Sequence, residues 1–353
     1  MLNRGIFLFG MERSGTTLLS MLVGAHPEIA VPLATAGLWY SFDKRQKEYN
    51  RLRDPNDLRR LVDDIIAHDR IQRWDERLDV EDVLPRCQTG DYSTVVAAFH
   101  SAYARAKGKS LWANMDIATL DQLHRANELF PDAKFVHIYR DARDVALSNL
   151  ETPYSKGNLA ECADNWSRRL TLNFRMGRIL GPDRYLAVSY EDVIQKPEST
   201  LGEVCDFVGV KYSHSMLQYG GDAAAKVPKD RQWLWLNMDG SLDRSAVQRW
   251  RRDMPTSKRI VVERYAGRLL DELGYEVYRP LPWRAFAELL DIFYFLERGR
   301  RFKRFLTALG VRPRSTLERR WGRAARGAQH GGHASGSPSR SSTEGARNET
   351  AGP

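Results

Sequence analysis

Short apolar runs, each followed by a helical pattern, recur along the chain. Residues 5–9 read GIFLF, which is typical of a buried strand, and residues 17–23 predict an apolar helix. Residues 134–139 and 184–190 are two further strand candidates, and a helix is expected soon after each of them. This repeated order of strand and helix predicts an α/β fold with a mostly parallel sheet flanked by helices.

Helices are also predicted between the first two of these strands, over residues 50–110. Leu58, Leu61, Val62 and Ile65 recur at i, i+3, i+4 and i+7, so they would share one face of a helix. We therefore expect one α/β domain over residues 1–280, with these helices inside it.

The composition changes after residue 280. Residues 281–353 hold 14 Lys/Arg and 6 Asp/Glu, whereas the rest of the chain is almost neutral, with 40 and 39. We expect basic helices over residues 281–326 and a disordered tail, rich in glycine and serine, over residues 327–353. Because the net charge of +9 belongs mainly to this appendage, it does not indicate a nucleic-acid-binding domain, and we expect no nucleic-acid partner.

The apolar positions of the first basic helix allow two interpretations. Leu289, Leu290, Phe293 and Leu296 share one helix face, beside the basic run at residues 298–304. The helix could pack on the domain, which we favour, or lie on an anionic lipid surface. The second interpretation would make the protein peripheral to a membrane. The sequence does not determine the oligomeric state.

Three observations bear on the compartment and on metal binding. No signal peptide follows Met1, and no stretch approaches the ~20 apolar residues that a membrane span needs. The three cysteines lie far apart, which favours a reducing compartment over a disulfide framework. The eight histidines show no ligand spacing, so we expect no metal site and a cytoplasmic protein.

The first candidate for binding chemistry is the loop after the first strand. Residues 10–17 read GMERSGTT, which has the spacing of a phosphate-binding GxxxxGK[ST] loop with Thr16 in place of the lysine. Backbone N–H groups at a helix start favour an anion. Arg13 adds a positive charge, and Gly15 lets the backbone approach the anion closely. Hydroxyl groups come from Ser14, Thr16 and Thr17. Turn and capping requirements alone are the alternative explanation for these residue types.

The second candidate follows the strand predicted at residues 134–139. Arg140 stands at its carboxyl end, where open α/β sheets bind ligands, and Ser148 follows about two helical turns later. The two side chains could hold another phosphate. The alternative is a surface set of ion pairs made by Arg140, Arg143 and the neighbouring aspartates.

Taken together, these motifs resemble the sulfotransferases that use 3′-phosphoadenosine 5′-phosphosulfate (PAPS), in particular a bacterial group related to the tyrosylprotein and carbohydrate enzymes. The similar segments occur in order and extend over about residues 4–278; they lie within residues 10–29, 129–148, 190–198, 207–209 and 245–275.

The resemblance implies a PAPS-dependent sulfotransferase with that family's fold, and it assigns roles to named residues. Residues 13–17 would grip the 5′-phosphosulfate, with Arg13 also stabilising charge on the transferring group. Arg140 and Ser148 would grip the 3′-phosphate. Tyr190 could stack near the adenosine or simply pack in the sheet, and Arg249 could meet the 3′-phosphate or be an ordinary helical arginine. The acceptor would be a hydroxyl or amine of a carbohydrate, a lipid or a small molecule.

Two residues that assist catalysis in the relatives are missing. The expected glutamate aligns with Ala34, and the expected lysine with Met115. A general base contributes about 10²–10⁴-fold to the reaction rate, so another residue would have to replace the missing glutamate for full activity. Asp116 is our first choice of base, with an N-cap of a following helix as its alternative role; His68 and Asp43 are weaker choices.

Three functions are therefore consistent with the sequence. The first is sulfuryl transfer from PAPS with release of adenosine 3′,5′-bisphosphate (PAP), either with a substitute base or to an acceptor acidic enough to need little help. The second is a weak or inactive relative that binds the nucleotide and acts as an interaction protein. The third is a P-loop nucleotide kinase, which the missing lysine of the loop disfavours.

Overall fold

The computed structural model describes residues 5–32, 38–117, 120–152, 158–219 and 242–278. The predicted basic helices and tail lie outside these ranges. The elements, in chain order, are β1 (Ile6–Gly10), α1 (Thr16–Gly24), β2 (Ile29–Ala30), α2 (Leu38–Ser41), η1 (Asp43–Leu52), α3 (Pro55–Ile66), α4 (Val80–Val83), η2 (Leu84–Arg86), α5 (Tyr92–Ala106), β3 (Leu111–Ile117), α6 (Leu120–Leu129), β4 (Lys134–Tyr139), α7 (Ala142–Leu150), α8 (Leu159–Leu180), β5 (Tyr185–Ser189), α9 (Tyr190–Gln195), α10 (Pro197–Val208), η3 (His214–Leu217), η6 (Arg244–Ala246), α12 (Trp250–Asp253) and α13 (Thr256–Glu272).

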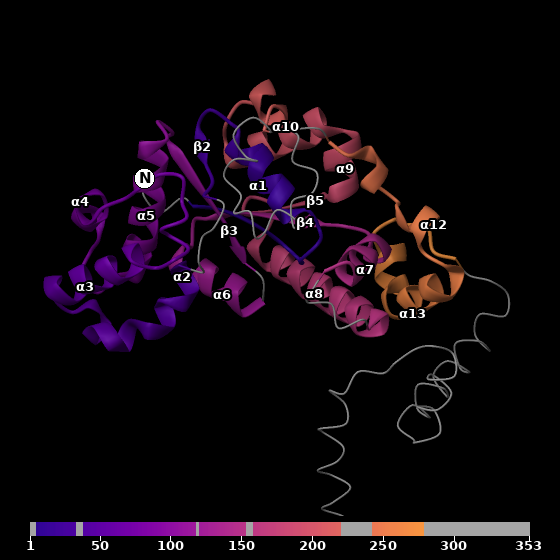
Figure 1. The fold of residues 1–353 in the computed structure, drawn as a ribbon, viewed down its shortest axis with the longest axis horizontal. Coiled ribbons are helices and arrows are strands. Elements are labelled where there is room, and N and C mark those ends of the chain that lie inside the picture. Colours follow the sequence, from indigo (N-terminus) through magenta and orange to yellow (C-terminus); the bar gives the residue numbers. More distant parts are fainter. Residues whose placement is uncertain (1–4, 33–37, 118–119, 153–157, 220–241, 279–353) are drawn as a thin grey trace, which may run out of the picture. The chain divides into compact units, whose positions relative to one another are not determined.

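The sheet has five parallel strands in the order β2-β3-β1-β4-β5 (Figure 1). The strands predicted from the apolar runs are confirmed as β1, β4 and β5, whereas β2 and β3 were not predicted. The chain leaves the central strand β1 toward one side of the sheet and later crosses to β4 on the other. The carboxyl ends of β1 and β4 therefore flank the point where the strand order reverses, which is where open α/β sheets bind ligands.

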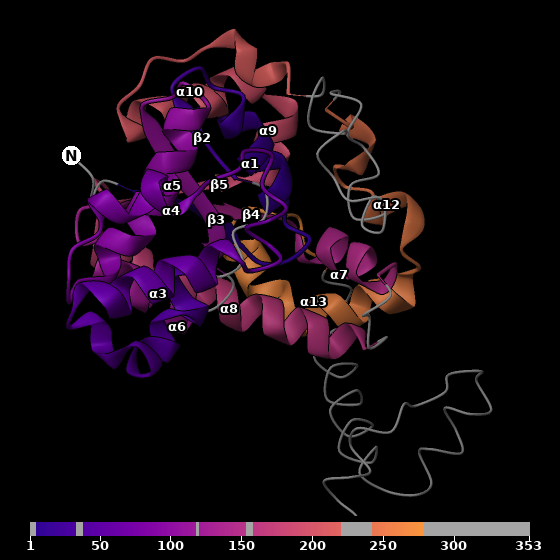
Figure 2. The same cartoon turned by 60° about the vertical axis from the view of Figure 1, so that its left-hand side comes forward.

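Side chains of the central strands point alternately to the two faces of the sheet, and this divides the core around the sheet into two layers. Phe7 and Phe9 of β1 pack with residues of α3, α5 and α6 on one face, whereas Ile6 and Leu8 pack with α1 and α10 on the other. Successive side chains of a strand point to opposite faces, so the unbroken apolar run of β1 fills both layers. Figure 2 shows the helices on the two sides of the sheet.

A third cluster of buried residues lies among α7, α8, α12 and α13. Trp166 of α8 and Trp250 of α12 are both almost fully buried there, with Leu270 of α13. The cluster places the start of α7, which follows the end of β4, against the segment that leads into α12. This packing decides where the second predicted anion site lies.

Candidate anion-binding site

The loop between β1 and α1 has the form that the sequence predicted, a glycine-containing turn leading into a helix. Gly15, the N-cap of α1, has φ +94°, and no side chain caps the helix. A Cβ on Gly15 would lie 2.5 Å from a ring carbon of Tyr190, so the loop approaches α9 more closely than another residue would allow. The first N–H groups of α1 have no acceptor within the helix and remain able to bind an anion.

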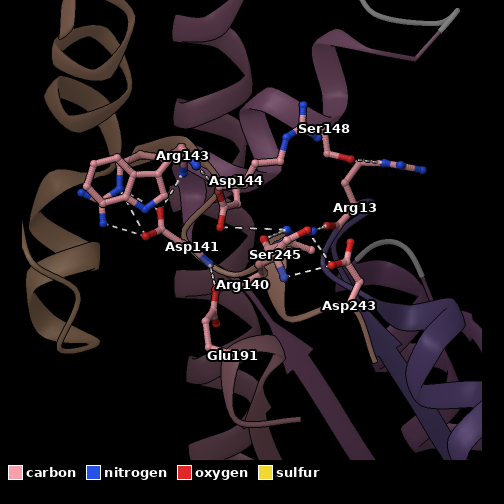
Figure 3. A network of polar contacts seen from close by, with 12 residues as sticks. Arg13, Arg140, Asp141, Arg143, Asp144, Ser148, Glu191, Asp243 and Ser245 are labelled. Carbon is pink, nitrogen blue, oxygen red and sulfur yellow. Dashed lines mark hydrogen bonds and ion pairs between the residues drawn. The ribbon is translucent and has the colours of Figure 1, made fainter. Parts of the chain in front are cut away.

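Arg13 lies in this loop with its backbone also in the left-handed region, at φ +69°. Its Nε donates a hydrogen bond of 2.8 Å to Oγ of Ser148 on α7 (Figure 3). The sequence assigned these two residues to separate anion sites, and the structure brings their side chains into contact. The two predicted sites are therefore adjoining parts of one region.

Arg140 follows β4 and completes the region. Its guanidinium donates to the backbone oxygen of Ala246 at 2.7 Å and to that of Arg13 at 3.4 Å, and it lies 4.1 Å from the ring centre of Tyr190. The side chain is 10% exposed, and its Nε is buried without a hydrogen-bond partner in the described part of the chain. Arg140 thus reaches both the first loop and the segment before α12.

Two guanidinium groups therefore lie close together in a largely enclosed place. Burial lowers the pKa of Arg13, and the positive charge of Arg140 lowers it further. Like charges held this close repel each other, and an anion placed between them would relieve that repulsion. The region suits a phosphate or a similar group.

Behind Arg140 lies a buried network that the sequence did not reveal. The Arg143 side chain is 1% exposed and donates to Asp141 at 2.6 Å and to Glu263 of α13 at 2.6 Å. Its guanidinium also lies 3.7 Å from the ring centre of Trp250. The expectation of a surface set of ion pairs is thus wrong for Arg143 and its aspartate partner, because the third core cluster covers them.

Glu191, at the start of α9, belongs to the same surroundings (Figure 3). Its carboxylate accepts hydrogen bonds from the Asp141 backbone at 3.1 Å and from the Tyr275 hydroxyl at 2.8 Å. Burial raises the pKa of Glu191 to about 7. The carboxylate joins the turn after β4 to the end of the domain, and in the sequence it was marked only as the second residue of the YEDV motif at residues 190–193.

The remaining predicted nucleotide-binding residues are placed as follows. Thr16 and Thr17 form the half-buried first turn of α1, and the buried Ser14 hydroxyl has no hydrogen-bond partner in the described part of the chain. Tyr190 is 8% exposed and packs between Gly15 and Arg140. These four residues surround the region that Arg13 defines.

Arg249 has carboxylate partners in the structure. It donates to both carboxylate oxygens of Glu151, which follows α7, and to Asp253 at 2.7 Å. All three of its guanidinium nitrogens therefore already bind carboxylates. The pairing with Glu151 ties the segment before α12 to the end of the helix that carries Ser148.

Of the candidate bases, Asp116 is placed nearest to the loop by the topology. It lies near the carboxyl end of β3, beside β1, at the same edge of the sheet as residues 11–15. This strand position excludes its alternative role as the N-cap of α6, which begins at Leu120. Met115 in the same strand packs on the core, and Ala34 lies outside the described residues.

The two weaker candidates have other partners. Asp43 accepts hydrogen bonds of 2.7 and 2.8 Å from Arg125. The ring of His68 meets Phe42 edge-on, with 5.7 Å between the ring centres. Neither contact involves the loop after β1.

Two further features of the described residues bear on metals and on membranes. Within the ranges given above, no three His, Cys, Asp or Glu side chains gather as a metal site would require. In the same ranges, no helix has both the length and the apolar character needed to cross a bilayer.

Comparison with known proteins identifies relatives of this chain. The sequence model of the sulfotransferase family matches residues 5–214. A protein-tyrosine sulfotransferase of Drosophila melanogaster is 24% identical over 61% of this chain and 40% of its own length. Protein-tyrosine sulfotransferase 2 of Gallus gallus is 24% identical over 78% of this chain and 71% of its own length.

A solved structure shares the fold. The sulfotransferase domain of the Synechococcus PCC 7002 olefin synthase superposes with a TM-score of 0.54 at 21% identity, over 78% of this chain and 95% of that domain. The predicted parallel sheet flanked by helices, of the kind found in sulfotransferases, is thereby confirmed.

Proposed function

The chain belongs to the sulfotransferase family, and from this premise we propose that it transfers a sulfuryl group from PAPS to an acceptor hydroxyl or amine and releases PAP. The observation that carries the proposal is the meeting of Arg13, Ser148 and Arg140 beside the uncapped start of α1. Such a group of charges and N–H donors suits a ligand with two anionic ends.

The loop and the arginines divide the donor between them. Residues 13–17 hold the 5′-phosphosulfate through backbone N–H groups, hydroxyls and the Arg13 guanidinium. Arg140 and Ser148 hold the 3′-phosphate, and the face of Tyr190 borders the adenosine. The lowered pKa of Arg13 reflects burial and a neighbouring cation, and a bound anion would offset both effects.

In the proposed reaction the acceptor oxygen or nitrogen attacks sulfur in line with the bond to the 5′-phosphate. The new bond to sulfur forms as that bond breaks, and the electron pair leaves with the phosphate oxygen of PAP. Arg13 stabilises the charge that develops there. Asp116 takes the acceptor proton, in a strand that ends beside the loop.

We propose the acceptor only as a broad chemical class, whereas we propose a single compound, PAPS, as the donor. The chain spans 40% of the length of the Drosophila relative and 71% of the Gallus relative, so their acceptor does not carry over with the alignment. A hydroxyl or amine of a carbohydrate, a lipid or a small molecule agrees with the proposed chemistry.

One observation favours a second candidate function, that of a weak or inactive relative that binds the nucleotide and acts through a partner. Met115 stands where relatives carry a lysine that assists catalysis, and its side chain packs on the core. Sulfate transfer to any acceptor, measured with labelled PAPS, would exclude this candidate.

The experiment that tests the donor site is thermal unfolding of the full chain with PAP, PAPS or Mg-ATP. A ligand at 100 times its Kd stabilises the native state by about 2.7 kcal/mol, which raises the melting temperature clearly. We expect a shift with PAP and PAPS in the absence of magnesium, and little shift with Mg-ATP. If PAP leaves the melting temperature unchanged and Mg-ATP raises it, the result contradicts the proposal and favours a nucleotide kinase.

A further inference from the structure

One buried carboxylate beside the anion-binding region has a role that sequence similarity does not assign. Asp144 lies in the first turn of α7, and its side chain is 0% exposed. Its Oδ1 accepts a hydrogen bond of 2.8 Å from the backbone N–H of Trp250. Its Oδ2 is buried and has no hydrogen-bond partner in the described part of the chain. Leaving a buried carboxylate oxygen without a partner is unfavourable, so its retention calls for an explanation.

The segment that Asp144 binds is the one that also binds Arg140. Gln248, two residues before Trp250, has φ +54°, a left-handed backbone conformation that residues other than glycine rarely adopt. Arg140 holds the same segment from the other side through the backbone oxygen of Ala246, at 2.7 Å. Asp144 and Arg140 therefore position one strained turn together (Figure 3).

The free oxygen of Asp144 also lies near the guanidinium itself, 3.9 Å from Nη2 of Arg140. Besides Arg140, the ionisable groups that act on it are Asp141, the N-cap of its own helix, and Tyr190 of α9. The turn into α12 faces it with the backbone N–H groups of Gln248 and Trp250. Burial raises the pKa of Asp144 to about 6, and Asp141 acts in the same direction, whereas Arg140 opposes the rise. The carboxyl is therefore charged at neutral pH.

We propose that Asp144 is a positioning residue that limits how tightly Arg140 holds a phosphate: it docks the turn before α12 and keeps a negative charge beside the guanidinium, which promotes release of the nucleotide product. This inference rests on the proposed function, because it concerns the same nucleotide. A fixed negative charge repels a phosphate and competes with it for Arg140. Product release limits turnover in many enzymes, and where it does, weaker binding of the product raises kcat.

Two substitutions separate the charge from the docking contact. Asp144→Asn keeps an oxygen that can accept the Trp250 N–H and removes the charge, so PAP should bind on the order of tenfold more tightly. Asp144→Ala removes both, so the turn loses its anchor and PAP should bind more weakly. A residue with a purely structural role would weaken binding in the Ala variant and would not tighten it in the Asn variant, which keeps the contact with Trp250.

The experiment is calorimetric titration of the full-length protein with PAP at pH 7.5, for the wild type and both variants, each shown to be folded by its melting curve. The same titrations at pH 5–8 compare the wild type with Asp144→Asn. The ionisation of the phosphate groups is common to the two proteins and cancels in their ratio. The wild-type affinity should approach that of the Asn variant as the pH falls below about 6, because Asp144 becomes neutral. In turnover with labelled PAPS, the Asn variant should lower kcat and also lower the KM for PAPS, because PAPS carries the same 3′-phosphate and product release becomes slower.

Each outcome decides the inference. Tighter binding by the Asn variant, with a gap that closes at low pH, supports it. A folded Asn variant that binds PAP as the wild type does, or more weakly, overturns it and leaves the proposed function standing. A wild type that does not bind PAP at all overturns both. Should the Asn variant not fold, wild-type affinity for inorganic sulfate, which stays a dianion over this pH range, must rise as the pH falls through about 6. A flat profile rejects the inference.

Discussion

The clearest test of the site is removal of the Arg140 guanidinium. Arg140→Ala deletes the charge that we assign to the 3′-phosphate and leaves the residues of the loop after β1 unchanged, although the backbone oxygen of Arg13 loses its contact with the guanidinium. A hydrogen bond to a charged group contributes about 1.5–3 kcal/mol. Loss of that contribution corresponds to a rise of about 10- to 150-fold in the Kd for PAP.

The same substitution also affects stability, so the two effects have to be separated. The backbone oxygen of Ala246 loses its donor, and Asp144 loses the cation 3.9 Å away. An unsatisfied buried group costs about 1–3 kcal/mol, which predicts a lower melting temperature. Calorimetric titration with PAP should therefore be done well below the melting temperature of the variant.

Arg251→Ala is the matched control. Arg251 lies 4.7 Å from the ring centre of Trp250, much as Arg140 lies over Tyr190, but its side chain is 44% exposed and pairs with Glu276 at 2.5 Å. The control removes the same charge from a neighbouring position, and we expect less than a threefold change in Kd because exposed ion pairs contribute little. If Arg140→Ala binds PAP as tightly as Arg251→Ala does, Arg140 does not hold a phosphate.

Three further predictions address other residues. Arg13→Ala should lower the rate of sulfate transfer by about 100-fold, far more than it lowers PAP affinity, and equal losses would make Arg13 only a binding group. Asp116→Asn should abolish transfer at unchanged PAP affinity, and retained transfer would remove Asp116 as the base. Glu191 has its pKa raised by burial from 4.5 to about 7, so folding stability should fall as the pH rises through this window. Chemical denaturation should show that Glu191→Gln abolishes about 3 kcal/mol of this fall, and an unchanged pH profile would contradict the assignment.

The parts of the fold that were predictable are those where local pattern and tertiary role agree. β1 is apolar on both faces because both faces are buried, so its sequence predicts a strand without knowledge of its neighbours. β3 mixes polar and apolar residues, including the buried Asn114, and only its pairing with β1 explains why it is a strand. β2 has two residues, which is too short for any pattern.

The candidate site, like the fold, could be predicted from the sequence only in part. The contact between Arg13 and Ser148 joins residues 135 positions apart. The two motifs, which the sequence assigned to separate sites, lie in one region because β1 and β4 are adjacent and parallel. Nothing local marks Arg143 as buried, since Glu263, which neutralises it, lies 120 positions away on α13. Sequence spacing thus identified the residues at the strand ends, but not the partners that helix packing brings to them.

In the proposed site, the charges at the start of α7 and just before it would make phosphate binding both strong and reversible. Arg140 lies just before the N-cap of α7 and Asp144 in its first turn, 3.9 Å from the guanidinium, so in the proposed site the cation that attracts a phosphate comes with an anion that competes for it. A second arginine in place of Asp144 would hold the product more tightly, but it would add a third positive charge beside Arg13 and Arg140, whose mutual repulsion already lowers the pKa of Arg13. The buried aspartate balances that charge while no ligand is bound. Under the proposed function, the same balance would weaken the bound state, as repeated release of a nucleotide product requires.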